Sequence, residues 1–318
     1  MKPVIEMHNH TFLSACCHEE AATGAAFVER AKEVGIQVLG ISNHCWDSRM
    51  PGASPWYAPQ TVEWCLKIKD ELPKDTGDVK VFVGIESEYK GMTDEVGISA
   101  EGAAQFDYVL IPHSHMHMVD FVIPFDPSYQ KALGIMQERL RAAFPEVSER
   151  QIEKWMMMAR QPDVKAMLPE YPVDHQFCAD FMCESFVGLL NNAEVQKFKD
   201  KVPTFVAHPF CACGYNRPDC QKMLSLIPDE KFKEMFTLMA DKGIGYDISV
   251  WNFGIDDPEN CQHFRIARIA RDCGVKFLFG TDSHDVAGLK WASRSTEIFE
   301  KLPLTKDDLH PMYRDFVK

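Results

Sequence analysis

The chain has 318 residues, of which 46% are hydrophobic, and a formal net charge of −13. This length allows one large domain or two ordinary ones, and the acidic balance argues against non-specific nucleic-acid binding, which needs a basic face. No apolar run reaches the roughly 18–20 residues of a membrane span, and the N-terminus lacks a signal peptide's basic and apolar regions. With eleven scattered cysteines, these features predict a cytoplasmic protein with reduced thiols and no membrane partner.

Seven apolar segments are predicted to be strands, at residues 4–7, 36–41, 79–85, 106–111, 204–207, 244–248 and 275–280. Several of them follow a helical segment that ends in glycine. The first such helix is predicted from Ala25 to Glu33, with Thr23 as its N-cap and Gly35 in the left-handed position at its end. Continuous apolar strands that alternate with helices indicate a parallel sheet covered on both faces.

Six of the seven predicted strands have a metal-ligand type of residue at the carboxyl end. In a barrel of parallel strands all carboxyl ends converge on one face, where catalytic groups collect. An open doubly wound sheet would gather them only near a topological switch point. The sequence therefore predicts a barrel of about seven strands, and we expect residues 1–318 to form a single domain.

The segment from 127 to 192 does not follow the alternation of strands and helices. It is predicted to form helices at residues 130–144, 149–160 and 176–190, separated by prolines. This helical insertion either covers the carboxyl ends of the strands as a lid or packs outside the barrel, and the sequence leaves both readings open.

Half of the twelve histidines lie at or just beyond a predicted strand end; they are His8, His10, His44, His115, His208 and His284. Glu86 and Asp282 also lie at strand ends, and Asp282 and His284 point the same way if the chain is extended. This donor set suits zinc, iron or manganese better than magnesium or calcium. It exceeds the roughly four to six ligands of one ion, so it predicts two or three ions. A carboxylate-bridged pair of ions favours hydrolysis, above all of a phosphate ester.

Six short motifs occur in order along residues 7–284; they are Met7-His8-Asn9-His10-Thr11, Asn43-His44, Gly84-Ile85-Glu86, His113-Ser114-His115, Ala207-His208-Pro209 and Gly280-Thr281-Asp282-Ser283-His284. Together they resemble the PHP family, the polymerase and histidinol phosphatase family. The resemblance implies a distorted (β/α)7 barrel with a trinuclear metal site that hydrolyses phosphoesters.

Carried over by motif, the resemblance implies three ligand sets. One ion would be held by His8, His10, Glu86 and Asp282, a second by Glu86, His115 and His208, and a third by His18, His44 and His284. His113 is an alternative to His115, and His18 lies further from His10 than in some family members. Asp282, His284 and Glu86 are the expected catalytic residues.

The expected activity is metal-dependent hydrolysis of a small phosphomonoester, a phosphorylated metabolite, by a metal-bound hydroxide. Arg49, Arg160 and Arg217 lie in loop or lid contexts that suit a phosphate clamp. Two alternatives stay open: histidinol-phosphate phosphatase in particular, and an amidohydrolase-like enzyme acting on a C–N bond. Asp247 lies near a strand end and could be a further ligand or base, but we interpret it as a structural hydrogen-bond partner. His263 is interpreted as a surface residue.

Overall fold

The computed structural model describes residues 3–118, 121–122, 127–148, 152, 173–215 and 217–318. Seven strands form one parallel sheet in the order β1-β2-β3-β6-β7-β8-β9. They are β1 (Ile5–Glu6), β2 (Val38–His44), β3 (Lys80–Glu86), β6 (Tyr108–Ile111), β7 (Thr204–Val206), β8 (Gly245–Ser249) and β9 (Phe277–Gly280). All seven lie within or beside the segments predicted from the sequence. A short antiparallel pair, β4 (Tyr89–Lys90) and β5 (Glu95–Val96), was not predicted.

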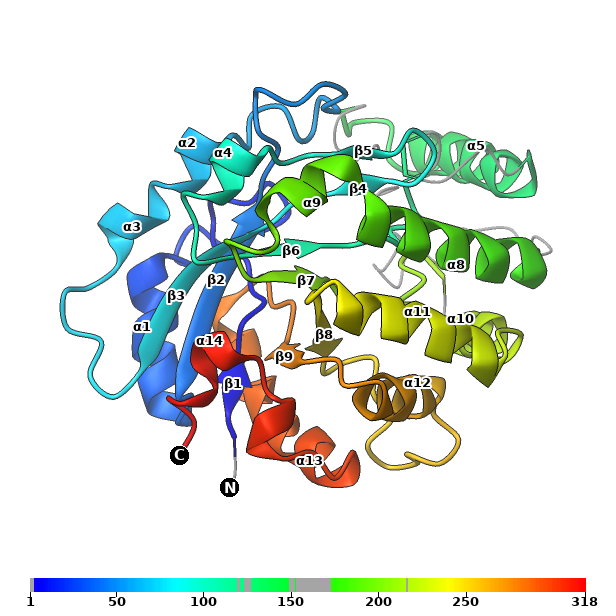
Figure 1. The fold of residues 1–318 in the computed structure, drawn as a ribbon. Coiled ribbons are helices and arrows are strands. Elements are labelled where there is room, and N and C mark those ends of the chain that lie inside the picture. The colour runs from blue at the N-terminus through cyan, green and yellow to red at the C-terminus, as the bar shows by residue number, and fades with distance from the viewer. Residues whose placement is uncertain (1–2, 119–120, 123–126, 149–151, 153–172, 216) are drawn as a thin grey trace.

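The first and last strands of the sheet lie next to each other, so the sheet is nearly closed into a barrel (Figure 1). The Met7 N–H donates to the Phe279 carbonyl over 2.8 Å, and the Asp282 N–H donates to the His8 carbonyl over 2.7 Å. Gly280 permits this approach, because a Cβ at this position would collide with the backbone and Cβ of His8. The prediction of a seven-stranded barrel is confirmed.

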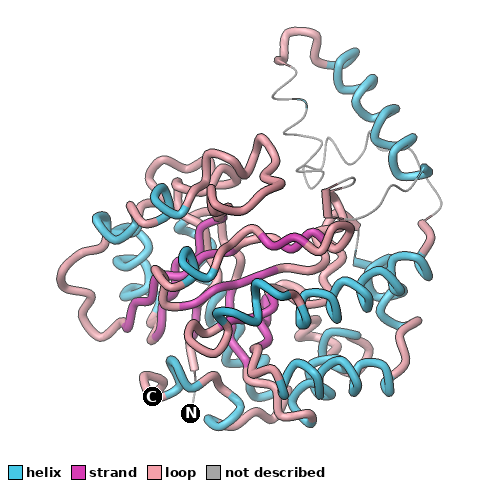
Figure 2. The backbone as a smooth tube through the Cα atoms, turned by 45° about the horizontal axis from the view of Figure 1, so that its top comes forward, coloured by secondary structure: helices cyan, strands magenta, loops and turns pink. Residues whose placement is uncertain are grey.

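Helices surround the strands, which occupy the centre of the molecule in Figure 2. They are α1 (Gly24–Val34), α2 (Val62–Cys65), α3 (Ile68–Glu71), α4 (Ala100–Ala103), α5 (Pro127–Ala143), α8 (His175–Asn191), α9 (Ala193–Phe198), α10 (Arg217–Ser225), α11 (Asp229–Asp241), α12 (Gln262–Asp272), α13 (Arg294–Lys301) and α14 (Pro311–Arg314), with 3-10 helices at Val286–Ser293 and Lys306–Asp308. The predicted ends of α1 are confirmed, since Thr23 accepts from the Ala26 N–H and Gly35 has φ 75°. In the described part of the chain, every helix is too short or too polar to span a bilayer.

Two helices of the 127–192 segment are described. In Figure 2, α5 extends outward from the rest of the described chain, whereas α8 packs against α10 and α11 and buries Phe181, Phe186 and Leu189 among other side chains. The helix predicted at 149–160 lies outside the described residues, apart from Ile152. The described part of the insertion thus includes one helix that packs outside the barrel.

Candidate metal centre

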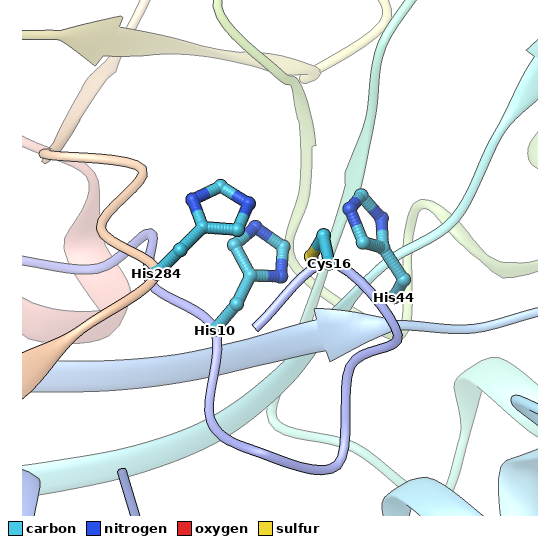
Figure 3. A group of neighbouring side chains, drawn as sticks. All are labelled: His10, Cys16, His44 and His284. Carbon is cyan, nitrogen blue, oxygen red and sulfur yellow. The ribbon is translucent and has the colours of Figure 1, made fainter. Parts of the chain in front are cut away.

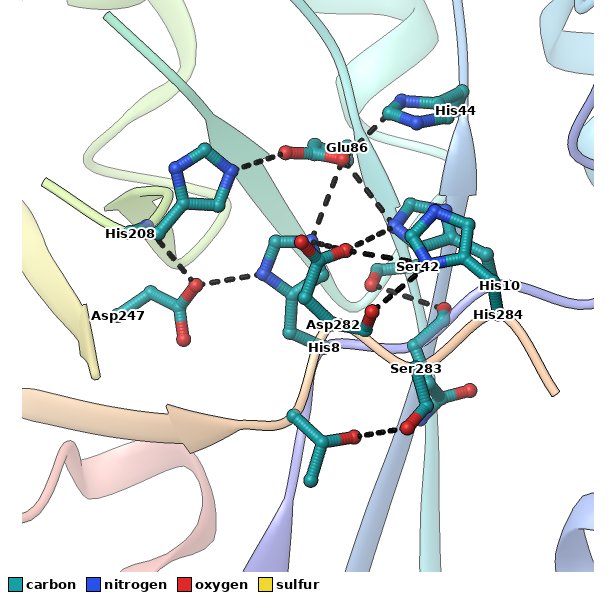
Figure 4. Close-up of polar contacts among 12 residues, drawn as sticks. His8, His10, Ser42, His44, Glu86, His208, Asp247, Asp282, Ser283 and His284 are labelled. Carbon is teal, nitrogen blue, oxygen red and sulfur yellow. Dashed lines mark hydrogen bonds and ion pairs between the residues drawn. The ribbon is translucent and has the colours of Figure 1, made fainter. Parts of the chain in front are cut away.

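The candidate ligands lie where the strands end. His8 and His10 follow β1, His44 is the last residue of β2, and Glu86 is the last residue of β3. The remaining four follow β6, β7 and β9; they are His115, His208, Asp282 and His284. Because the strands are parallel and nearly closed into a barrel, all eight side chains meet at one end of it (Figure 4 labels all of them except His115).

Glu86 is the centre of this cluster. Its Oε2 lies 3.4 Å from Nε2 of both His8 and His10 and 3.2 Å from Nδ1 of His44. Its Oε1 lies 3.1 Å from Nε2 of His208 and 4.0 Å from Nε2 of His115. The side chain is only 1% exposed. One carboxylate therefore faces five imidazoles from four different strand ends. Three of these imidazoles lie near Oε2 and the other two lie near Oε1.

Asp282 is the second carboxylate of the cluster. Its Oδ1 lies 3.2 Å from Nε2 of His10, 3.7 Å from Nε2 of His8 and 3.9 Å from Nδ1 of His284. Its backbone φ is 52°, in a region that non-glycine residues rarely adopt, and its N–H donates a hydrogen bond to the His8 carbonyl. His208 also has a positive φ, of 29°. Such backbone strain is common at functional sites, and here it occurs at two predicted ligands.

The donors fit divalent metal ions. Among the described residues, three groups each bring potential ligand atoms within 4.8 Å of one another: His8, His10, Glu86 and Asp282; His115, His208 and Cys213; and His10, Cys16, His44 and His284. In the described structure, Nε2 of His8, Nε2 of His10 and Nδ1 of His44 are buried and lie within ion-pair distance of Glu86, but none of them makes a hydrogen bond. Buried polar atoms without a hydrogen bond are rare and costly. A cation among these nitrogens and carboxylates would satisfy them.

The charges of the cluster are strongly coupled. Burial acts against the charged form of Glu86, but the neighbouring His8 and His44 hold the pKa of this carboxyl well below its usual value. Burial likewise opposes ionisation of Asp282, and contacts with His10 and His8 hold its pKa well below normal. Both groups are thus carboxylates at neutral pH, the form that binds a metal ion.

The histidines of the cluster divide into two sets, those whose pKa is raised and those whose pKa is lowered. Burial disfavours protonation of His208, but Glu86 outweighs it and raises its pKa to about 9. Burial, reinforced by His208, lowers the pKa of His115 to about 4, and burial with His10 nearby lowers that of His284 to about 4. The cluster therefore holds protons beside its carboxylates where the field is most negative, which is where cations would bind.

Two further acidic side chains, Asp247 and Glu88, hold imidazoles of the cluster at their Nδ1 atoms. Asp247 on β8 places its Oδ2 2.7 Å from Nδ1 of His8 and accepts from the backbone N–H of His208. Glu88 places its Oε2 2.6 Å from Nδ1 of His115 and accepts from the hydroxyl of Tyr57. A proton on Nδ1 leaves Nε2 free to bind a metal ion. The interpretation of Asp247 as a hydrogen-bond partner agrees with the structure, whereas Glu88 was missed; its place two residues after Glu86 was the available signal.

The structure distinguishes His113 from His115. His115 faces Glu86 and His208, as described above. His113 is fully buried, accepts a hydrogen bond from the Phe210 N–H over 3.0 Å, and packs edge-on against the rings of Phe186 and Phe210. His115 thus lies in the cluster and His113 in the apolar packing beside it.

His18 is exposed and belongs to none of the three ligand groups, whereas Cys16 lies in the group that contains His44 and His284 (Figure 3). His263, interpreted as a surface residue, is instead 3% exposed, because it lies on the inner face of α12 with Phe264 and Ile266. That interpretation was wrong.

A cavity of about 220 Å³ opens beside the cluster and is lined by His208, Cys211, Cys213, Ser249, Trp251, Asn252 and Asp282. The described residues that line it include neither Arg49 nor Arg217. Arg49 donates to Asp47 over 2.8 Å, and Arg217 is exposed with its guanidinium 4.0 Å from the Cys261 sulfur. Arg160 lies outside the described residues.

One comparison with a solved structure points to the same fold. The structure of histidinol phosphate phosphatase from Lactococcus lactis, complexed with zinc, L-histidinol and phosphate, aligns with a TM-score of 0.53 and 14% identity over 95% of this chain and 94% of that one. An N-isopropylammelide isopropylaminohydrolase from Burkholderia multivorans aligns with a TM-score of only 0.37 and 14% identity, over 98% of this chain and 72% of that one.

In sequence, a probable phosphatase from Clostridium acetobutylicum is 27% identical over 110 residues, which are 35% of this chain. The match spans 40% of that relative's length. No protein-family model matches the chain. The chain therefore has the nearly closed barrel fold of the histidinol phosphate phosphatase, with a histidine-rich candidate metal centre at the carboxyl ends of its strands.

Proposed function

We propose that the chain is a metal-dependent phosphomonoesterase of the PHP type, acting on a small phosphorylated metabolite at a centre of two or three divalent ions. The observation that carries this proposal is the convergence of six imidazoles and two carboxylates, Glu86 and Asp282, at one end of the barrel, with buried nitrogens left without hydrogen bonds. A purely structural cluster would be expected to satisfy those nitrogens.

Each ligand group has its own set of donors. His8, His10, Glu86 and Asp282 would hold one ion, and His115 and His208 a second, with Glu86 between the two. His44 and His284 would contribute to a third. Zinc, iron and manganese suit this set of nitrogen and carboxylate donors. When bound, such ions lower the pKa of water and neutralise the charge that develops on a phosphoryl group.

The protein's own side chains would fix the geometry of the reaction. Asp247 and Glu88 hold His8 and His115 with their Nε2 atoms directed at the centre. Asp282 borders both the cluster and the cavity, so a phosphoryl group in the cavity would lie beside it and His208. Since no lysine or arginine of the described residues lines this cavity, the cations there that would attract an anionic substrate are the proposed metal ions.

The two named phosphatases support different parts of the proposal. The similarity to the Lactococcus lactis structure supports the fold. The Clostridium acetobutylicum relative is named a probable phosphatase, and the match covers 40% of its length. Histidinol phosphate belongs in any substrate panel because the Lactococcus lactis protein was solved with L-histidinol and phosphate.

The test combines metal content by mass spectrometry with phosphate release from a panel of histidinol phosphate, nucleoside monophosphates and sugar phosphates. Asp282→Ala should lose both metal and phosphate release, whereas Asp256→Ala, at an exposed position, should keep both. Two or more ions per chain and release of phosphate from one substrate class would support the proposal. A chain that binds less than one ion after loading with zinc, iron or manganese would overturn it. A fully loaded chain that releases no phosphate but cleaves amide substrates would favour the C–N hydrolase instead.

A further inference from the structure

The loop that follows β1 is built around the side chains of Asn43 and Ser14. Asn43 Oδ1 accepts from the N–H of Thr11 over 2.8 Å, and from the hydroxyls of Thr11 and Ser14 over 3.0 Å each. Ser14 Oγ in turn accepts from the N–H of His44 over 2.9 Å. All of these groups are buried. The loop therefore has a defined conformation and is attached to the end of β2 next to His44.

The residues on both sides of Cys16 are also held. The Ala15 N–H donates to Gln60 Oε1 over 2.9 Å, and the Cys17 N–H donates to the Ser14 carbonyl over 3.0 Å. The Cys17 thiol donates to the carbonyl of His284 over 2.9 Å, so the loop is tied to the segment after β9. This turn places Cys16 among the imidazoles, while His18, two residues later, is exposed at the surface.

Cys16 shares a ligand group with three histidines. A ligand atom of each of His10, Cys16, His44 and His284 lies within 4.8 Å of the others. The rings of His44 and His284 stack on that of His10 with centroids 4.4 Å and 4.6 Å away. Figure 3 shows Cys16 between His10 and His44. His44 is only 6% exposed, and its Nδ1 makes no hydrogen bond within the described structure.

We propose that Cys16 binds a divalent ion through its Sγ, together with His44 and His284, in the place where the sequence led us to expect His18. This inference deepens the proposed metal centre and rests on it. The other donors of the group are imidazoles, which are neutral as ligands, so the thiolate is the one anionic ligand that the group itself supplies. The thiol releases its proton to solvent as the Sγ–metal bond forms.

A sulfur ligand changes which ion this position selects. Thiolates favour zinc and iron over manganese and magnesium, and mixed nitrogen and sulfur donors are common for tetrahedral zinc. We therefore expect the position that contains Cys16 to take zinc or iron, and the group of His8, His10, Glu86 and Asp282 to accept a harder ion as well.

The test measures metal content and metal–sulfur bonding in the whole chain. After zinc loading, X-ray absorption at the zinc edge should show sulfur at about 2.3 Å. Cys16→Ser should lose about one ion per chain and lose or weaken this sulfur signal. Cys273→Ser, a matched change at a partly exposed cysteine, and His18→Ala, which removes the competing ligand, should change neither. Cys213→Ser identifies any sulfur contributed by the group of His115 and His208.

The wild-type chain provides a second measurement that does not depend on a variant folding. Cobalt loading should produce a thiolate-to-cobalt charge-transfer absorption, and bound zinc should protect Cys16 from alkylation, as read by peptide mass mapping. The absence of a sulfur signal, equal alkylation of Cys16 with and without zinc, or loss of an ion in His18→Ala but not in Cys16→Ser would each overturn the inference. Phosphate release separates the two proposals: sulfur-bound zinc without phosphatase activity refutes the proposed function alone, and an active enzyme without sulfur bonding refutes this inference alone.

Discussion

The contact between Asp247 and His8 allows a quantitative test of the proposed metal centre. Asp247 Oδ2 lies 2.7 Å from Nδ1 of His8 and 3.1 Å from the backbone nitrogen of His208, and neither Asp247 nor His8 is exposed. Asp247→Asn keeps the shape of the side chain and one oxygen that can accept a hydrogen bond, but it removes the negative charge. His8 then loses the partner that holds its Nδ1 proton and makes its Nε2 a stronger donor.

The expected magnitude follows from this geometry. A hydrogen-bonded partner behind a metal ligand typically contributes about 10- to 100-fold in metal affinity or activity, which corresponds to about 1.4 to 2.7 kcal/mol. Because the pair is fully buried, solvent does not screen the interaction, and we expect Asp247→Asn to lie in the upper half of that range. Most of the loss should be in metal affinity and in kcat, with a smaller change in KM.

The assay is competition for zinc against a chromophoric chelator, followed by kinetics at saturating metal. Asp107→Asn is the matched control, because Asp107 accepts from the Val83 N–H over 2.8 Å near the amino-terminal start of β6. It should lower stability by about 1 kcal/mol without changing metal affinity. Unchanged zinc affinity in Asp247→Asn would refute the reasoning, and an equal loss of zinc in both variants would trace the effect to general destabilisation.

Three further outcomes are expected. Glu86→Gln should lower the proposed phosphatase activity by about 100-fold or more and reduce the number of ions bound, because it removes the carboxylate shared by five imidazoles. Mass spectrometry and phosphate release would measure this, and full metal content would contradict it. Gly280→Ala should destabilise the fold by about 1–3 kcal/mol in denaturant unfolding, because its Cβ would collide with His8, whereas Gly134→Ala, where the space is open, should leave stability unchanged or higher. Burial and nearby Arg217 lower the pKa of His263 to about 4. Between about pH 6.5 and pH 4 this histidine is therefore protonated in the unfolded chain but not in the folded one, and stability decreases as the pH is lowered through this range. His263→Gln should remove about 2 kcal/mol of the stability lost between pH 7 and pH 5, and an identical pH dependence in both proteins would count against this account.

Most of the fold could be predicted because its signals are local. The strands are continuous apolar runs, and the first helix has a threonine cap and a terminal glycine that act within a few residues. The strand-end histidines could also be predicted to converge, since parallel strands in a barrel bring their carboxyl ends to one face. His8, His44 and Glu86 belong to this class, because His44 and Glu86 are the last residues of their strands and His8 lies two residues beyond β1.

Side chains that lie in irregular loops could not be placed in this way. His113 and His115 are two residues apart and would share a face in an extended strand, yet one packs against Phe186 and Phe210 while the other faces Glu86. The same holds for Cys16 and His18, whose directions depend on the hydrogen bonds of the loop to Asn43 and Gln60.

The amino-acid sequence by itself determined where the apolar strand segments lie along the chain and which residue types follow them. It therefore determined a barrel with histidines and carboxylates at one face. Only the tertiary structure decided which donors point inward, and it brought Glu88 and Asp247 behind their imidazoles. The physical reason is that the period of a strand sets side-chain direction only while the backbone remains extended. Beyond the strand ends, direction is set by contacts with residues that are distant in the chain.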